Sequence, residues 1–258
     1  MTATSKGNEL AIVTGASRGL GHALAAALHA RGATLLTISR RPCVLTGTRG
    51  NARHDDWNAD LADPLPLANR LAAWLAGPRG ETFRSVVFIH NAATLSTPAP
   101  LADVPLPELT QAMRVNLEAP IVLSAAFLHA TAGWATATRK LVFISSGLGR
   151  TAMAGAASYC AAKAGLDHLA RSLALEEGAR SNGARVVSLA PGVIDTDMQV
   201  QPRAADAAAF VARQRFVALK EGGQLAAPAA AAARLLAAID HADFGAQPVA
   251  DVREYAGR

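Results

Sequence analysis

A serine, a tyrosine and a lysine could together transfer a proton to or from an oxygen atom. Tyr159 and Lys163 are four residues apart in the alanine-rich stretch 145–165, SSGLGRTAMAGAASYCAAKAG, so they would lie on one face of a helix. Ser146 comes just after the apolar run 141–144 and could hydrogen-bond the same oxygen. We therefore predict a tyrosine acid–base, although a plain helix with a half-buried tyrosine and a solvated lysine would show the same spacing.

The lysine would change the pKa of the phenol. A free phenol has a pKa of about 10, too high for ready proton exchange near neutral pH. An ammonium about 4 Å away contributes roughly 4 kcal/mol at an effective dielectric of about 20. That energy corresponds to up to about three pKa units at 1.36 kcal/mol per unit. We therefore expect Lys163 to bring the pKa of Tyr159 to about 7.

A glycine cluster lies between two patterned segments near the start of the chain. Residues 10–14 form a short apolar run typical of a buried parallel strand, and residues 20–30 form an alanine-rich helix. Gly15, Gly19 and Gly21 come between them. A glycine loop in this position lets backbone N–H groups approach a pyrophosphate at the helix N-terminus, which indicates a dinucleotide site.

Together these motifs resemble the short-chain dehydrogenase/reductase family. The resemblance rests on TGASRGLG at 14–21 with Ser146, Tyr159 and Lys163, and it extends over nearly the whole chain. The later segments YCAAKAGLDHLARSLALEE and APGVIDTDMQ are similar to those of sepiapterin reductases and bacterial benzil-reductase-like members. The resemblance implies that Tyr159 donates a proton to a carbonyl oxygen, that Ser146 polarises this oxygen, and that Lys163 also holds the nicotinamide ribose.

The resemblance also implies a role for an asparagine within a helix expected over 108–130. Asn116 would bulge this helix, and its freed carbonyl would hold a water behind Lys163 in a proton relay. Asparagine is a poor residue for a helix interior, which gives the bulge a physical basis. An asparagine that only kinks the helix is the alternative.

The end of the second predicted strand, 34–39, bears on the choice of cofactor. An acidic residue here would bind the ribose 2′-hydroxyl of NAD, but Ser39 stands in its place and Arg40 follows. Arg18 lies in the glycine loop. Arginines can grip a 2′-phosphate bidentately, so the sequence favours NADPH/NADP, with ordinary solvated arginines as the alternative.

The remaining dinucleotide contacts are implied by the resemblance alone. Asp60 would cap the adenine and Leu61 would pack on it, while the backbone near Ile194 and the hydroxyl of Thr196 would meet the nicotinamide amide. The segment His90-Asn91-Ala92-Ala93 resembles the family's NNAG, with two substitutions. The other residues in this group are Ser17, Leu20, Asn91, Ala92, Ala93, Pro191 and Gly192.

The order of elements predicts one doubly wound α/β domain over 1–258, a Rossmann fold with a mostly parallel seven-stranded sheet and helices on both faces. We expect a loop at 43–53 and a substrate lid at about 197–223. The further strands are expected just before Asp60 and at 85–90, 141–144, 184–190 and 248–252. The further helices are expected at 64–76, around Tyr159, at 204–219 within the lid, and at 226–238.

Composition excludes several classes of protein. The net charge is +5, but the arginines are scattered and aromatic residues make up 5%, so we expect no nucleic-acid partner. Cys43 and Cys160 are too few for a disulfide framework, and the histidines lack metal-ligand spacing. No apolar run reaches membrane length and no signal-peptide pattern precedes residue 10, so a cytoplasmic protein without a membrane partner is expected. Apolar residues around much of the segments 121–127 and 166–175 predict a homodimer or homotetramer.

The leading hypothesis is an NADPH-dependent carbonyl reductase acting on a small-molecule ketone or vicinal dicarbonyl. An NADP- or NAD-dependent alcohol dehydrogenase, running the reaction in reverse, remains open. A dinucleotide-sensing protein without turnover is the alternative from another class, but Ser146, Tyr159, Lys163 and Asn116 are all present. In sepiapterin reductases a C-terminal aspartate grips the pterin, and Asp251 is the nearest candidate here.

Overall fold

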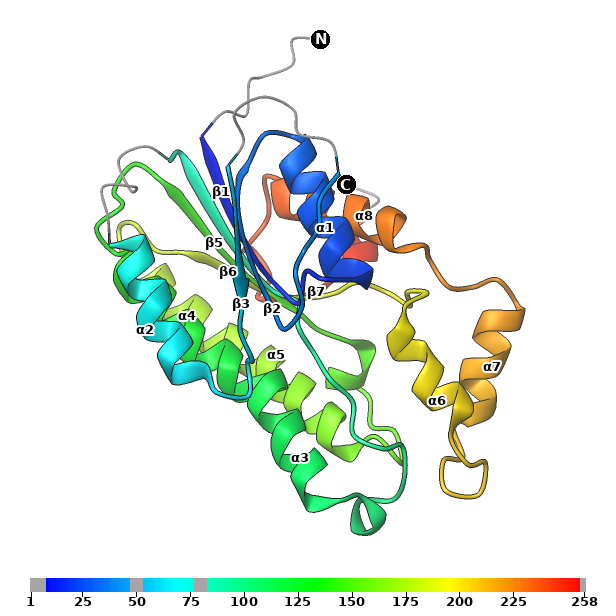
Figure 1. Cartoon of the computed structure of the whole chain (residues 1–258). Coiled ribbons are helices and arrows are strands. Elements are labelled where there is room, and N and C mark those ends of the chain that lie inside the picture. The colour runs from blue at the N-terminus through cyan, green and yellow to red at the C-terminus, as the bar shows by residue number, and fades with distance from the viewer. Residues whose placement is uncertain (1–7, 47–52, 77–82, 256–258) are drawn as a thin grey trace.

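A parallel β-sheet forms the centre of the computed structural model, which describes residues 8–46, 53–76 and 83–255 (Figure 1). Within these residues the sheet has seven strands in the order β3-β2-β1-β4-β5-β6-β7, and every neighbouring pair is parallel. The predicted doubly wound fold is thereby confirmed. The strands are β1 (Glu9–Thr14), β2 (Thr34–Ser39), β3 (His54–Asn58), β4 (Ser85–His90), β5 (Thr138–Ile144), β6 (Arg185–Ala190) and β7 (Val249–Asp251).

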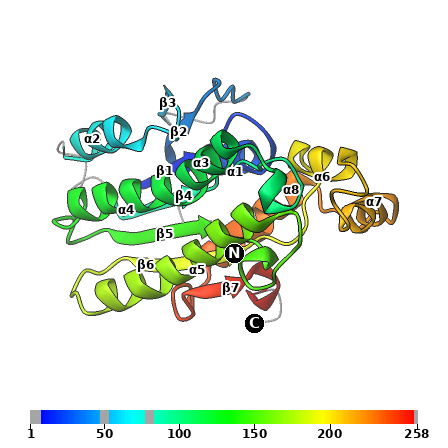
Figure 2. The same ribbon diagram turned by 90° about the horizontal axis from the view of Figure 1, so that it is seen from below.

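Helices cover both faces of this sheet and extend beyond it. Helices α1 and α8 pack on one face, and α2, α4 and α5 pack on the other (Figure 1). Helices α6 and α7 project away from the sheet, as two perpendicular views show (Figures 1 and 2). The helices are α1 (Gly19–Ala30), α2 (Pro64–Leu75), α3 (Leu106–Met113), α4 (Ala119–Ala130), α5 (Ala157–Gly178), α6 (Val200–Ala204), α7 (Arg213–Glu221) and α8 (Pro228–Asp240).

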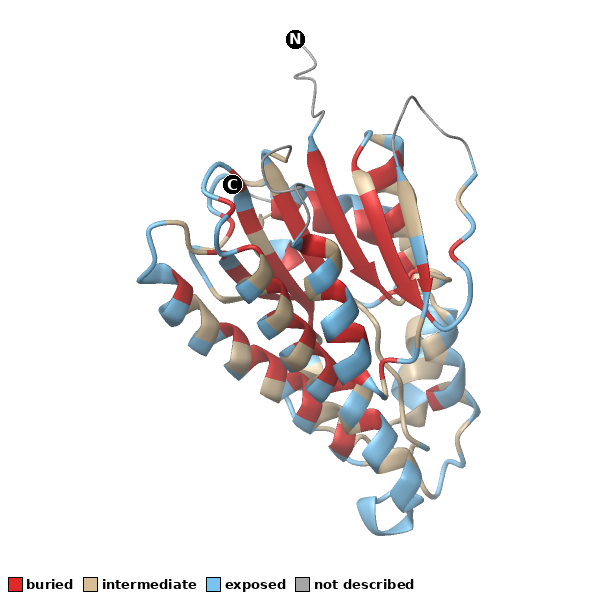
Figure 3. Cartoon of the chain, turned by 60° about the vertical axis from the view of Figure 1, so that its left-hand side comes forward, coloured by how far each residue is buried: buried red, intermediate tan, exposed pale blue. Residues whose placement is uncertain are grey.

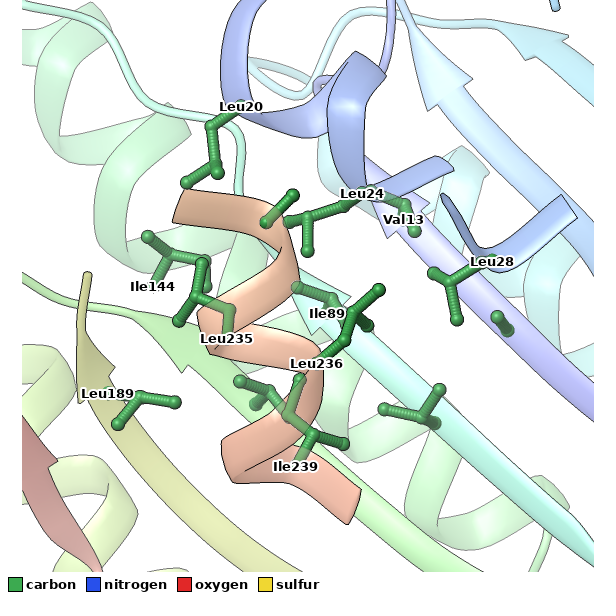
Figure 4. Packing of buried hydrophobic residues seen from close by; sticks show 14 of the residues in the cluster. Val13, Leu20, Leu24, Leu28, Ile89, Ile144, Leu189, Leu235, Leu236 and Ile239 are labelled. Atoms are coloured by element: carbon green, nitrogen blue, oxygen red, sulfur yellow. The ribbon is translucent and has the colours of Figure 1, made fainter. Parts of the chain in front are cut away.

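The central strands are buried along almost their whole length (Figure 3). A parallel sheet covered on both faces needs apolar residues on both sides of each strand, which explains their continuous apolar runs. Between the sheet and the α1–α8 layer, Leu24, Leu28, Leu235, Leu236 and Ile89 belong to one cluster of buried apolar residues (Figure 4). This packing fixes the start of α1, and with it the glycine loop, against the end of β1.

The strand order changes direction between β1 and β4. Successive crossovers from β1 run one way to β2 and β3, and the chain then returns to place β4 on the other side of β1. In such sheets the loops leaving the two strands diverge and open a crevice beyond their carboxyl ends, where ligands bind. The loops after Thr14 and His90 therefore define the expected binding edge.

Several predicted elements differ in extent from those observed. The single helix expected over 108–130 consists of α3, a π-helical turn (Arg114–Glu118) and α4. The lid helix expected at 204–219 is wrong: helices lie at 200–204 and 213–221, and 205–212 is not helical. The loop predicted at 43–53 falls partly on residues 47–52, outside the described residues. No helix in the described ranges combines the length and apolar character that a membrane span requires.

Candidate active site

One large cleft opens at the carboxyl edge of the sheet. Its volume is about 1330 Å³, and the loops after β1, β2, β4, β5 and β6 line it together with residues of the lid. The catalytic candidates Ser146, Tyr159 and Lys163 lie on its wall. All the predicted cofactor-binding residues also line it, namely Gly15, Ser17, Arg18, Gly19, Leu20, Gly21, Ser39, Arg40, Asp60, Leu61, Asn91, Ala92, Ala93, Tyr159, Lys163, Pro191, Gly192, Ile194 and Thr196.

Ser146 and Tyr159 face each other across the short turn that leaves β5. Ser146 has extended backbone and caps the 3₁₀ helix η3 (Gly147–Gly149), its Oγ accepting from the Leu148 N–H at 3.2 Å. Burial raises the pKa of Tyr159 to about 12, and a hydrogen bond with Ser146 acts against this rise. The expectation of a Tyr159 pKa near 7 is therefore wrong for the protein groups alone, because removing the phenolate from water outweighs the hydrogen bond with Ser146, and Cys160 adds to the rise.

Lys163 lies against one face of the Tyr159 ring. Its Nζ donates to the backbone oxygen of Ile144 at 2.7 Å and lies 5.5 Å from the centroid of the Tyr159 ring. Only 2% of Lys163 is exposed, and burial lowers the pKa of its ammonium to about 8 while Asp167 acts to raise it. The lysine is thus fixed at the end of β5, the strand that delivers Ser146.

Asn116 lies in the π-helical turn, so the predicted bulge is confirmed. In an α-helix the N–H of residue 120 would donate to the Asn116 carbonyl, but Pro120 has no N–H. The preceding N–H, that of Ala119, donates to the oxygen of Arg114, five residues back, which is the π-helical pattern. The buried Asn116 amide clasps the backbone of Thr94: Nδ2 donates to the Thr94 oxygen and Oδ1 accepts from its N–H, both at 2.8 Å. Asn116 itself does not line the cleft, and its part in a proton relay stays a prediction.

The glycine loop has the close contacts that a dinucleotide cradle needs. Gly15 has a φ of 70°, and a Cβ on Gly21 would lie 2.2 Å from the Gly15 oxygen and 2.4 Å from Asn91 Nδ2. The same Asn91 Nδ2 donates to the Thr14 oxygen at 2.9 Å, which joins the loops after β1 and β4. Because no side chain fits here, backbone N–H groups at the start of α1 remain accessible to a phosphate, so these residues fit a dinucleotide.

The end of β2 supplies the cationic side of the cleft. Ser39 is 5% exposed, and its Oγ donates to the Arg41 oxygen at 2.8 Å, while the Arg40 side chain is exposed. Arg18 forms an exposed ion pair with Asp197 of the lid, Nη1 to Oδ2 at 2.5 Å. This pairing could not be predicted from the sequence, because the two residues are far apart along the chain.

Comparison with known proteins agrees with this geometry. The short chain dehydrogenase profile matches residues 9–207, well over half of the chain. The chain belongs to the short chain dehydrogenase family.

Its relatives include enzymes that reduce carbonyl compounds. Benzil reductase ((S)-benzoin forming) of Bacillus cereus is 31% identical over 220 residues, covering 84% of this chain and 88% of the relative. Sepiapterin reductase of Mus musculus is 31% identical over 256 residues, covering 95% and 96%. A solved metagenomic short-chain oxidoreductase in complex with NADP is 30% identical, with a TM-score of 0.61 over 74% of this chain and 84% of that one. The resemblance seen in the sequence is thereby confirmed.

Within this short chain dehydrogenase, apolar side chains from the loop after β5 and from the lid line part of the cleft, which we call its apolar wall. Its lining includes Leu148, Met153, Met198 and Phe216. The sequence motifs missed these residues because they come from separate loops and from the lid, and only folding brings them together. The amphipathic pattern of the lid was the one available signal.

The lid is anchored to the neighbouring loops at two places. Phe210 is 2% exposed and packs on Gly155, where an added Cβ would come within 2.5 Å of its ring. At the base of the lid, Lys220 pairs with Asp195 at 2.6 Å. These two contacts hold the lid beside the loops that follow β5 and β6.

Asp251 lines the cleft, but its carboxylate is already paired. Arg253 donates to it through Nε at 2.7 Å and Nη2 at 2.8 Å, and the Arg253 backbone N–H adds a bond of 3.0 Å. These bonds hold the pKa of Asp251 below its ordinary value. A substrate amine would have to compete with this bidentate arginine for the same oxygens.

Proposed function

We propose that the protein is an NADPH-dependent carbonyl reductase that acts on a ketone or a vicinal dicarbonyl compound. The observation that carries the proposal is the pairing of Ser146 with Tyr159 at the cleft. Two hydroxyl groups directed at one place can bind one carbonyl oxygen. The raised pKa of Tyr159 keeps its phenol protonated at neutral pH, as a proton donor must be.

The nicotinamide, when bound, supplies a hydride to the carbonyl carbon. The chain supplies the proton and the orientation. Tyr159 donates its proton to the carbonyl oxygen, and Ser146 donates a hydrogen bond to that oxygen as negative charge develops on it. The Lys163 ammonium lies close enough to stabilise the phenolate that remains on Tyr159, and in this proposal it also binds the nicotinamide ribose. Asn116 holds the Thr94 backbone, which lines the cleft nearby.

The glycine loop and the end of β2 would hold the rest of the cofactor. Gly19 and Gly21, at the start of α1, offer backbone N–H groups to the pyrophosphate, while Gly15, whose N–H bonds to the Ile38 oxygen at 2.8 Å, shapes the loop. Arg40 offers a guanidinium to a 2′-phosphate. Ser39 leaves this place without the carboxylate that would repel a phosphate. The related metagenomic enzyme, whose structure contains NADP, supports this choice of cofactor.

The apolar wall supports a substrate with two apolar groups flanking its carbonyls. Leu148, Met153 and Phe216 can contact aryl or alkyl groups beside the reacting oxygen. The benzil reductase relatives are named for such a diketone. The pairing of Asp251 with Arg253 favours a neutral diketone over a pterin, which would need that carboxylate.

The direct test is cofactor oxidation by the purified protein with benzil, sepiapterin and a simple aliphatic diketone, each with NADPH and with NADH. We expect turnover of benzil with NADPH at a higher kcat/KM than with sepiapterin. Tight NADPH binding without turnover of any carbonyl would instead favour a dinucleotide-sensing protein. Turnover only of an alcohol with NADP would favour a dehydrogenase.

A further inference from the structure

A buried carboxylate lies beneath the catalytic residues without lining the cleft. Asp167 is on α5, one helical turn after Lys163, and is 2% exposed. Its Oδ1 accepts hydrogen bonds from the hydroxyls of Ser145 and Ser188, each at 2.6 Å. Its Oδ2 lies 3.3 Å from Arg150 Nε. One side chain therefore contacts β6 and both ends of the turn that follows β5 and carries Ser146.

The contacts of Asp167 hold this turn at both ends. Ser145 directly precedes Ser146, and Arg150 directly follows η3. Between them, Gly149 packs so tightly on α5 that an added Cβ would lie 3.0 Å from Asp167 Oδ2 and 3.0 Å from the Lys163 oxygen. The position of Ser146 relative to Lys163 thus depends on groups that meet at Asp167.

Joining a helix to a sheet through a buried carboxylate is energetically unfavourable. Burying a charge is strongly unfavourable unless hydrogen bonds and counter-charges offset the loss of hydration. In the turns next to Asp167, this helix packs on the sheet through apolar residues such as Leu166 and Ala170. Replacing a buried polar cluster by apolar residues is often neutral or stabilising, so fold stability alone gives little reason for a carboxylate at this place.

We propose that Asp167 is a positioning residue, which fixes the Ser146 turn against the helix carrying Tyr159 and Lys163. This inference rests on the proposed function, because it assigns Ser146 and Lys163 to one reaction. A misplacement of about 1 Å in a reacting group can cost about 100-fold in rate. Loss of the Asp167 contacts is therefore expected to lower kcat more than cofactor affinity.

Asp167 also acts on the charge of Lys163. Burial lowers the pKa of Lys163 to about 8, and Asp167 is the charged group that raises it. Without the carboxylate, Lys163 would lose its proton at a lower pH. Among the described residues, the other titratable groups on Lys163's own helix turn are Tyr159 and Cys160. The charged groups on or next to the elements packed against this helix are Arg150, Asp251, Arg253, Glu108, Arg114, Glu118 and Arg185, of which Arg114 and Glu118 form an exposed pair with each other.

The same helix offers a matched control. Glu177 is also buried, at 3% exposed, and its Oε2 accepts from the Ala184 N–H at 2.8 Å and pairs with Arg139 at 3.4 Å. It joins α5 to the start of β6, at the far end of the helix, and does not line the cleft. A role in stability alone would give Asp167→Asn and Glu177→Gln the same effects.

The experiment compares Asp167→Asn and Glu177→Gln in the full chain. For Asp167→Asn we expect kcat for the reduction to fall about 10- to 100-fold, with a smaller change in the Kd of NADPH. The decline of kcat/KM at alkaline pH should shift to lower pH. Glu177→Gln should lower Tm and leave both the kcat and the pH profile near those of the wild type. If Asp167→Asn has the same kcat and the same pH profile as the wild type, the proposal is overturned.

A second measurement needs no substrate. The lysines of the chain are Lys6, Lys140, Lys163 and Lys220, so ¹³C-labelled lysine gives few NMR signals, and a Lys163→Arg variant identifies that of Lys163. Its titration midpoint should be lower in Asp167→Asn and unchanged in Glu177→Gln. If no carbonyl is reduced by the wild type, the proposed function fails, while this shift still decides whether Asp167 sets the charge of Lys163. If Asp167→Asn does not fold, Ser145→Ala with Ser188→Ala removes the two hydroxyl contacts, and a wild-type kcat in that variant would contradict the proposal.

Discussion

Lys163 Nζ lies over the ring of Tyr159, 5.5 Å from the ring centroid, and is hydrogen-bonded to the Ile144 oxygen rather than to the phenol. A cation over the face of an aromatic ring is attracted by the ring quadrupole. The hydrogen bond to the Ile144 oxygen also holds the ammonium at one place on that face of the ring. Lys163 is therefore placed to stabilise a phenolate formed during the reaction, while Tyr159 stays protonated before it.

The rates of carbonyl reduction and of alcohol oxidation should change in opposite directions with pH. In the proposed mechanism, reduction uses the protonated phenol and the Lys163 ammonium, and burial lowers the pKa of Lys163 to about 8. The kcat/KM for reduction should therefore be level at lower pH and fall as pH rises through about 8. Oxidation of the alcohol needs the phenolate of Tyr159, so its rate should increase with pH. A reduction rate that rises through the same range would contradict these assignments.

Lys163→Ala should impair both chemistry and cofactor binding, because the proposal gives this residue two tasks. Lys140 provides the control, since it too is buried in part and donates to a backbone oxygen, that of Ile239 at 2.5 Å, outside the cleft. We expect Lys163→Ala to lower kcat and raise the Kd of NADPH, measured by fluorescence titration. Lys140→Ala should lower Tm without changing that Kd. An unchanged Kd in Lys163→Ala would remove the ribose contact from the account.

The preference for NADPH depends on the 2′-phosphate, the only group that differs from NADH. A charge-assisted hydrogen bond contributes about 1.5–3 kcal/mol, so the loss of one should change affinity by roughly 10- to 150-fold. The double change Ser39→Asp with Arg40→Ala should weaken NADPH strongly and improve NADH, because the new carboxylate repels phosphate and accepts from ribose hydroxyls.

The measurement is kcat/KM with both cofactors. Arg53→Ala, an exposed arginine outside the cleft, is the control and should leave the ratio unchanged. A wild type that prefers NADH would overturn the cofactor assignment. An unchanged ratio in the double variant would place the phosphate away from Arg40.

We also expect a homo-oligomer, although the surface available for it is smaller than the sequence pattern indicated. Leu166 and Phe127 of the two apolar segments are buried in the core, whereas Ile121 is 42% exposed and Leu175 is 79% exposed. Exposed apolar residues on neighbouring helices suit a symmetric contact. Light scattering at micromolar concentration should give a dimer or tetramer, and Leu175→Glu with Ile121→Glu should lower the measured mass. A monomeric wild type would refute this expectation.

The fold and most of the cleft followed from local patterns in the sequence. Gly15 and Gly21 lie between a strand and a helix, and a parallel sheet brings the ends of its strands to one edge, so the loops after β1 and β4 could be placed together in advance. Tyr159 and Lys163 share a helix, which fixes their spacing. These relationships depend only on short segments and on the handedness of the crossovers.

Contacts between distant segments were not accessible in this way. The pairing of Arg18 with Asp197 and the meeting of Ser145, Asp167 and Ser188 depend on how loops and strands pack in three dimensions. The predicted Tyr159 pKa near 7 is wrong because the burial of the phenol, which raises its pKa, is a property of the folded cleft. The π-helical turn had a readable signal in Pro120, four residues after Asn116.

The central claim is that Tyr159 donates the proton to the carbonyl, and Tyr159→Phe tests it most directly. The change removes one hydroxyl and leaves the ring, which lines the cleft over Lys163. The measurement is kcat for NADPH-dependent benzil reduction, together with the Kd of NADPH. The account predicts that kcat falls by about 10²- to 10⁴-fold, as is usual for loss of a general acid, while the Kd stays close to that of the wild type. A kcat near the wild-type value would contradict it.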